Sequence, residues 1–137
     1  MKYKFIFALS FAFGLFSCGN DVSLVGKWEI VETDSSTVHK SIQNFYEDNT
    51  WKERDSVILK NVHLISNVIY TEWEGTWSEK DDLFTIETKR GTLNGVSLPS
   101  EGLLLKSYKI VSKKRDKIEC YEIHDDKKEI ITMVRKE

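Results

Sequence analysis

The sequence predicts an all-β fold, and three features of residues 18–137 support this prediction. These residues include no alanine, the best helix former, since both alanines of the chain lie before residue 18. Val, Ile and Thr, which fit β-strands, supply 30 of these 120 residues. Short runs of alternating apolar and polar residues recur about eight times between turn residues. This spacing favours a meandering sandwich or barrel over alternating strands and helices.

The expected strands follow one another along the chain. They cover residues 24–31, 42–46, 50–55, 67–78, 83–88, 103–112, 118–123 and 129–135. Asp48 and Asn49 suit a tight hairpin because both residue types tolerate a positive φ. Residues 57–65 are expected either to pair as a further strand or to make a loose excursion. The last three strands should form an up-and-down meander.

The strand at 67–78 shows the clearest alternation between a dry and a wet face. Trp73 and Trp77 should therefore point the same way, into an apolar interior. Two local irregularities are also expected. A β-bulge between Cys120 and Tyr121 would place the apolar residues of that strand on one face. Residues 33–41 could form a turn or two of helix, with Asp34 or Ser35 as the cap.

Residues 1–17 have the pattern of an export signal. Lys2 and Lys4 precede an apolar stretch, and the small residue Ser17 ends it. A helix that crosses a membrane needs about 20 apolar residues, and this stretch has too few. The sequence therefore predicts a signal peptide at 1–17, a short tether at 18–23 and one domain at 24–137.

Residues 15–18, with the sequence LFSC, resemble the lipobox of bacterial lipoproteins, although Phe16 is bulkier than its usual occupant. The resemblance implies diacylglycerol on the Cys18 sulfur, cleavage before Cys18 and acylation (as by palmitate) of the new amino terminus. Several acyl chains anchor a protein stably where one does not. Gly19 is not an inner-membrane retention aspartate, so we expect outer-membrane attachment in the cell envelope, on the periplasmic or the surface face. The alternative is ordinary secretion with an incidental cysteine.

The charge of the exported part gives no indication of nucleic-acid binding. Without Lys2 and Lys4, 18 basic residues remain beside 22 acidic residues, a net charge of −4. No basic patch favours nucleic acid, and we expect a monomer. With Cys18 lipidated, Cys120 has no partner for a disulfide, so we interpret it as a small buried hydrophobic residue.

Residues 25–30 resemble the G-x-W opening of lipocalins, with Gly26 and Trp28 in the motif positions. In lipocalins the tryptophan plugs the closed end of the barrel and a basic residue of the last strand lies across it; Arg135 holds the matching position. Residues 44–51 and 75–78 are similar to further segments of lipocalin-like domains in lipoproteins of Bacteroidota, with Asn49 where glycine is usual. The resemblance implies a single antiparallel up-and-down barrel of about eight strands, lipocalin-like and of the calycin type.

The sequence shows no signature of an enzyme, a metal site or a cofactor site. His39, His63 and His124 are far apart in sequence, and none pairs with another His or Cys at zinc-ligand spacing. The acidic clusters lack the spacing of a calcium loop. Motifs for serine hydrolases, nucleoside triphosphates and dinucleotides are also missing. We therefore expect a non-enzymatic protein without a cofactor.

Four aromatic residues are candidates for a ligand lining: Trp51, Trp73, Trp77 and Phe84. Trp51 shares a strand face with Glu53 and Asp55, which either line a polar-mouthed cavity or lie in water at the barrel rim. For the other three, a packed core is favoured over a ligand pocket, because aromatic stripes mostly supply burial. Two functions stay open: a lipid-anchored barrel that binds a small hydrophobic molecule, and a packed barrel that serves as a protein-interaction or structural module. Small inward residues opposite Trp73 would favour the first.

Overall fold

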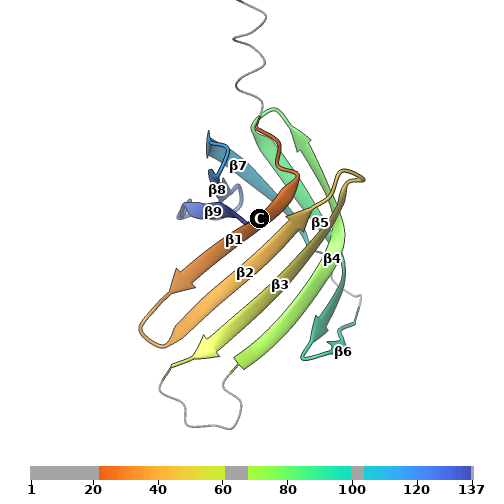
Figure 1. Ribbon diagram of the computed structural model, residues 1–137, viewed down its shortest axis with the longest axis vertical. Helices are drawn as coiled ribbons and strands as arrows, with labels where there is room; N and C mark the ends of the chain where they lie inside the picture. The colour runs from red at the N-terminus through yellow and green to blue at the C-terminus, as the bar shows by residue number, and fades with distance from the viewer. Residues whose placement is uncertain (1–21, 61–67, 100–103, 137) are drawn as a thin grey trace, which may run out of the picture.

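The computed structural model describes residues 22–60, 68–99 and 104–136, and these form nine strands and no helix. The strands are β1 (Gly26–Thr33), β2 (Thr37–Phe45), β3 (Thr50–Leu59), β4 (Val68–Lys80), β5 (Leu83–Leu93), β6 (Val96–Ser97), β7 (Leu105–Lys113), β8 (Lys117–Glu122) and β9 (Ile131–Lys136). Figure 1 shows them wrapped around a common interior.

The strands close into an antiparallel barrel. Each strand pairs with its neighbour in sequence, except that β7 pairs with β5 because β6 is a short addition to the edge of β5. Pairing of β1 with β9 closes the ring, so eight strands form the barrel. The predicted all-β, up-and-down barrel of lipocalin-like fold is confirmed.

The helix considered for residues 33–41 is wrong, because residues 37–45 form strand β2. Asp34 still caps backbone groups, but in the turn between β1 and β2. Its Oδ1 accepts hydrogen bonds from the N–H groups of Ser36 and Thr37, both at 2.7 Å. These bonds stabilise the carboxylate and lower the pKa of Asp34. An aspartate can satisfy the backbone of a tight turn as well as that of a helix start.

The bulge expected between Cys120 and Tyr121 is also wrong, since both residues pair consecutively with Ile110 and Lys109 of β7. The irregularity lies in β7 itself, where Val111 is the extra residue between Ile110 and Ser112. Val111 is 51% exposed, so the bulge turns an apolar side chain outward. Without a bulge in β8, Cys120 stays buried while Ile123, on the opposite face, is 39% exposed.

Two strands extend further than expected. Strand β3 continues to Leu59, so the first part of the ambiguous segment 57–65 belongs to it, and residues 61–67 lie outside the described part. Strand β5 continues to Leu93, and Asn94 and Gly95 turn the chain back into β6 with φ of 48° and 83°. Two positive φ values are what a two-residue hairpin turn requires.

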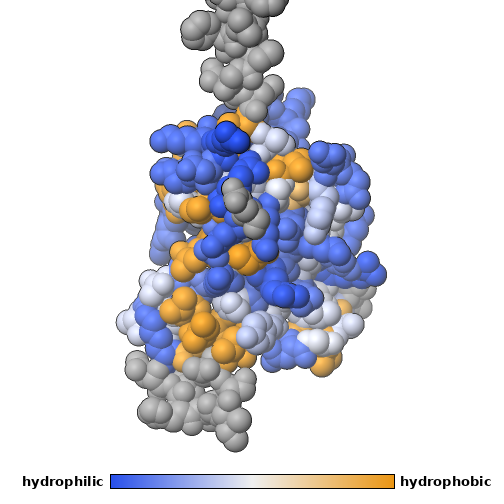
Figure 2. All heavy atoms as spheres, in the orientation of Figure 1, coloured by the Kyte–Doolittle hydropathy of each residue, from blue (hydrophilic) through white to orange (hydrophobic). Residues whose placement is uncertain are grey.

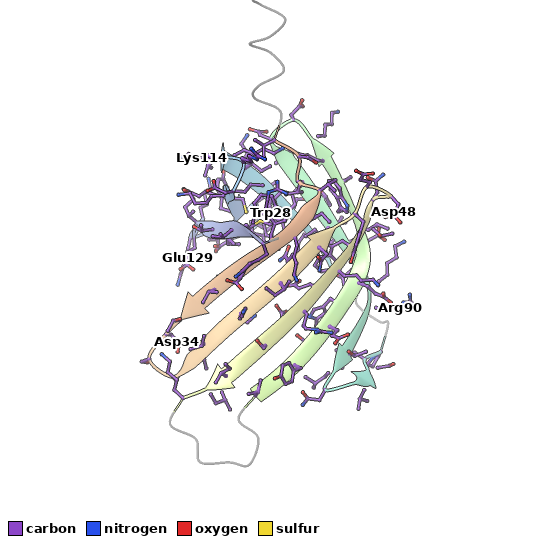
Figure 3. All side chains as sticks on the ribbon, viewed as in Figure 1. Trp28, Asp34, Asp48, Arg90, Lys114 and Glu129 are labelled. Carbon is purple, nitrogen blue, oxygen red and sulfur yellow. The ribbon has the colours of Figure 1, made fainter. Side chains whose placement is uncertain are left out.

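The apolar core fills one end of the barrel, the end at which the hairpin of Asp48 and Asn49 joins β2 to β3. Asn49 has the positive φ that the sequence predicts, at 64°. Side chains exposed by 9% or less form this core: Leu24, Trp28, Phe45, Trp51, Trp77, Phe84, Ile86, Ile110, Ile118, Cys120 and Met133. Asp34 and Asp48 mark opposite ends of the barrel in Figure 3.

Arg135 covers the core at this closed end. Its guanidinium carbon lies 4.2 Å from the ring centroid of Trp28, which is fully buried (Figure 3). The same guanidinium donates to the carbonyls of Ser23, Val25 and Arg115 at 2.7–3.0 Å. A Cβ atom at position 26 would lie 2.5 Å from the guanidinium nitrogen Nη1 of Arg135, so this position needs a glycine. The cation therefore fixes the segment before β1 onto the barrel end.

The outer surface is mostly hydrophilic, with separate hydrophobic patches (Figure 2). Over the described ranges, no helix has the length and apolar character needed to cross a membrane.

Candidate ligand-binding cavity

The inner wall changes from apolar to polar along strands β2 and β3. Phe45 lies opposite Trp51, the next inward pair is Gln43 and Glu53, and the pair after that is Ser41 and Asp55. Because side chains alternate between faces, all these residues point into the barrel. The half of the barrel farther from the closed end therefore has a polar interior.

This half contains a cavity of about 260 Å³. Its apolar wall consists of Trp51, Trp73, Ile86, Leu104 and Tyr108. Its polar wall consists of His39, Gln43, Glu53, Asp55, Thr88 and Lys106. Ligand pockets commonly combine an apolar lining with a few convergent polar groups and start at about 300 Å³. The cavity has this character, with room for a small molecule.

Glu53 is the most perturbed ionisable group of the cavity. Burial, the nearby negative charge of Asp55 and a side-chain hydrogen bond with Asp55 raise its pKa to about 8. The hydroxyl of Ser41 donates a hydrogen bond to its Oε1 at 2.6 Å, which opposes the shift only in part. Glu53 is therefore mostly protonated at neutral pH.

Two buried polar atoms of the cavity wall have no hydrogen-bond partner within the described residues: Oδ1 of Asp55 and Nε1 of Trp51. His39 Nε2 approaches Asp55 Oδ1 to 3.3 Å without the geometry of a hydrogen bond, and Thr71 Oγ1 donates to Oδ2 at 3.4 Å. Leaving a buried polar atom unsatisfied costs about 1–3 kcal/mol. Each such atom offers a hydrogen-bonding position to a molecule inside the cavity.

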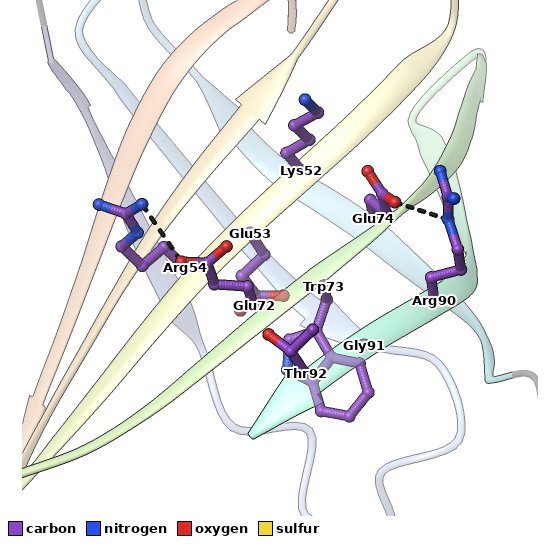
Figure 4. A pocket seen from close by; sticks show the side chains of 9 residues that line it. All are labelled: Lys52, Glu53, Arg54, Glu72, Trp73, Glu74, Arg90, Gly91 and Thr92. Atoms are coloured by element: carbon purple, nitrogen blue, oxygen red, sulfur yellow. Dashed lines mark ion pairs between the residues drawn. The ribbon is translucent and has the colours of Figure 1, made fainter. Parts of the chain in front are cut away.

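A second hollow of about 200 Å³ lies at the wall formed by β3, β4 and β5 (Figure 4). Glu53 and Trp73 line both hollows. Its outer side carries the ion pairs Arg54 with Glu72, at 3.2 Å, and Arg90 with Glu74, at 2.6 Å. Both arginines are at least 70% exposed, and exposed pairs contribute little to stability. We therefore place the candidate site in the enclosed cavity.

The structure separates the four aromatic residues singled out in the sequence. Trp51, 3% exposed, and Trp73 lie on the cavity wall. Trp77 and Phe84 lie in the packed core: Trp77 Nε1 donates to the carbonyl of Tyr46 at 3.0 Å, and Phe84 stacks on Tyr108 with centroids 4.8 Å apart.

Sequence reasoning missed several residues of the cavity, among them Lys106 and Tyr108, and it considered His39 only as a metal ligand. The signal that could have found them is alternation, because Lys106 and Tyr108 are two residues apart in one strand and share a face. Cys18 lies outside the described residues. Cys120 is 1% exposed, and its burial raises the pKa of the thiol to about 12, so it is a packed core residue.

The chain has a lipocalin-like barrel with a half-polar interior. No family model and no curated protein matches it. In the part of the chain that the structure describes, no three or more His, Cys, Asp or Glu side chains form a group that could hold a metal ion.

Proposed function

We propose that this protein is a lipid-anchored envelope lipoprotein whose barrel binds a small molecule without transforming it. The observation that carries the proposal is the cavity of about 260 Å³ with unsatisfied buried polar atoms on Trp51 and Asp55. A barrel filled for stability alone has no need of such atoms, since each one opposes folding.

The lining favours a ligand with an apolar body and one polar group. Trp51 and Trp73 offer flat apolar surfaces, and Glu53 and Asp55 offer oxygen atoms on the same part of the wall, where Glu53 is the cross-strand neighbour of Trp73. A purely hydrophobic molecule would leave the buried carboxyl groups without partners, which costs binding free energy. The ligand would partition into the barrel and orient by its polar end.

The alternative is a packed barrel that contacts another protein, and the interior volume separates the two proposals. Gly91 is the residue opposite Trp73 in the register of β4 and β5, and the ring of Trp73 covers it. Thr88 is a small residue that lines the cavity together with Trp73. The packing therefore favours the ligand-binding barrel.

The anchor is proposed from the sequence around Cys18. Residues 23–25 lie at the closed end, where Arg135 donates hydrogen bonds to the carbonyls of Ser23 and Val25. The described part of the chain therefore begins at the closed end, while the polar half of the barrel lies toward the other end.

Native mass spectrometry of residues 19–137 from a heterologous host tests the binding function. Every strand pairing and core contact that the structure describes lies within residues 22–136, so this chain retains them. We expect a small molecule to co-purify, or lipophilic amphiphiles to quench the tryptophan fluorescence. A clean apo mass without any quenching would favour the packed interaction module instead.

Fractionation of cells that express the full chain tests the anchor. Cys18→Ser should release the protein from the membrane fraction, because no acyl chain can then be attached. Cys120→Ser is the matched control and should leave the fractionation unchanged. Membrane association of Cys18→Ser equal to that of the unchanged chain would contradict the lipoprotein proposal.

A further inference from the structure

The cavity wall holds two carboxyl groups beside each other. Glu53 and Asp55 are two residues apart on β3 and therefore share its inner face. The negative charge of Asp55 contributes to the raised pKa of Glu53, so the empty cavity does not hold both groups ionised at neutral pH. A positive charge between the two groups would let both ionise.

Other charged or titratable side chains face this pair from two strands. His39 of β2 lies 3.3 Å from Asp55, and Lys106 of β7 acts electrostatically on Glu53. Tyr108 of β7 has a pKa raised by burial and by nearby acidic groups, so it remains a neutral phenol. Glu122 of β8 is the cross-strand neighbour of Tyr108 and adds a further negative charge at this wall. Among the carboxyl and amino groups that line the cavity itself, the charges of Asp55 and Lys106 balance when Glu53 is protonated.

This balance distinguishes a cationic from an anionic ligand. A cation that displaces the proton of Glu53 leaves the total charge of the cavity unchanged. An anion adds a negative charge to a wall that already carries Asp55, and only the uptake of a further proton by the cavity wall would restore the balance. Charges in a partly buried site interact more strongly than in water, so the cavity discriminates against the anion.

Two further observations point to a ligand at this place. Oδ1 of Asp55 is a buried acceptor without a hydrogen-bond partner in the described part of the chain, and an ammonium group can donate to it. Trp51 is only 3% exposed and lines the same cavity. Its Nε1–H has no hydrogen-bond partner among the described residues. Trp51, Trp73 and Tyr108 also present aromatic surface, which attracts cations.

We propose that the cavity binds a small organic amine with a flat apolar body, its ammonium group donating to Asp55 and Glu53 and its ring packing against Trp51 and Trp73. This inference rests on the proposed small-molecule binding and names the ligand class. On binding, the proton of the Glu53 carboxyl group passes to solvent and the ammonium group takes its place beside the carboxylate. No covalent bond forms or breaks in the ligand.

Isothermal titration calorimetry with three probes that share one ring system tests the inference. The probes are 1-naphthylmethylamine, 1-naphthylmethanol and 1-naphthoate, which are cationic, neutral and anionic at neutral pH. At pH 8 the amine should bind about tenfold more tightly than the alcohol, because a charge-assisted hydrogen bond replaces a neutral one. The naphthoate should bind most weakly of the three.

Proton release and two isosteric variants identify the groups involved. Titration at pH 7 in two buffers of different ionisation enthalpy should show that about one proton leaves per amine bound. Glu53→Gln should abolish this release, and Asp55→Asn should remove the preference for the amine while the alcohol still binds. Glu72→Gln removes an exposed carboxylate from the outer face of the same wall and is the matched control, expected to bind like the unchanged chain.

The outcomes separate this inference from the proposed function. Naphthoate binding as tightly as the amine, or an amine preference that survives both variants, would overturn the inference and leave small-molecule binding standing. Failure of all three probes to bind would overturn the inference, while the co-purification experiment still decides the proposed function.

Discussion

Replacing Glu53 by glutamine should stabilise the protein at pH 8 and have little effect at pH 5. The pKa of Glu53 is about 8 in the folded chain, against an ordinary value of 4.5. Between these two values the folded chain keeps a proton on Glu53 that the unfolded chain has lost. The free energy of unfolding therefore falls as pH rises through this window, by at most about 1.4 kcal/mol per pH unit.

The substitution removes this loss because glutamine does not ionise. From pH 5 to pH 8, ionisation of Glu53 lowers the free energy of unfolding by at most about 4 kcal/mol. We expect Glu53→Gln to recover roughly 2–4 kcal/mol of it at pH 8. Glutamine keeps an oxygen that can accept the hydrogen bond from Ser41, so the packing should be preserved. A gain of this size at a buried position is typical of residues retained for function rather than for stability.

Urea unfolding followed by tryptophan fluorescence at pH 5 and pH 8 measures the effect. Glu72→Gln is the control, since its side chain is 58% exposed and its removal should change stability little at either pH. A gain of the same size at both pH values, or a loss of stability at pH 8, would refute the argument that Glu53 is held protonated by its surroundings.

Three further predictions concern the closed end and the core. Arg135→Lys should lower the free energy of unfolding by about 2 kcal/mol in urea titrations, because an ammonium group cannot reproduce the guanidinium's contacts with three carbonyls and Trp28. An unchanged unfolding midpoint would refute the stabilising role of Arg135. Phe45→Ala should cost about 3–5 kcal/mol by thermal unfolding, whereas Val31→Ala, at a 54% exposed position, should cost under about 1 kcal/mol. Cys120 should resist a thiol reagent until urea unfolds the barrel; fast labelling of the native chain would show that the core opens.

The alternation of side chains allowed most of the barrel to be predicted from the sequence. Strand β4 is the clearest case, since inward Trp73 and Trp77 alternate with charged and hydroxyl residues over its length. Strand β2 was harder to predict, because Thr37–Phe45 contains few apolar residues and its inner face carries Ser41 and Gln43. A strand whose buried face is polar lacks the signal on which the prediction depends.

The remaining differences have local causes. Asn94 and Gly95 are a strong signal for a two-residue hairpin, yet they stand within a stretch rich in turn residues, where the short strand β6 is easily missed. The bulge at Val111 was not predicted, because Ile110 and Val111 are both apolar and the sequence does not show which of them points inward.

The site could be predicted only in part. Trp51, Glu53 and Asp55 share a strand face in the sequence, but whether that face is a solvated rim or a cavity wall depends on the strands opposite. His39 and Lys106 join the site only through the closure of the barrel, which brings β2 and β7 around the same space.

The most direct test of binding in the polar half of the barrel is an NMR titration of the four tryptophan indole N–H signals of residues 19–137 with 1-naphthylmethylamine. Trp28 Nε1 donates to the carbonyl of Leu24 at 2.8 Å in the core and should not respond. Trp51 Nε1 is unpartnered on the cavity wall, so its signal should shift as the probe saturates the site. A shift of the Trp28 signal with an unchanged Trp51 signal would contradict the placement of the binding site.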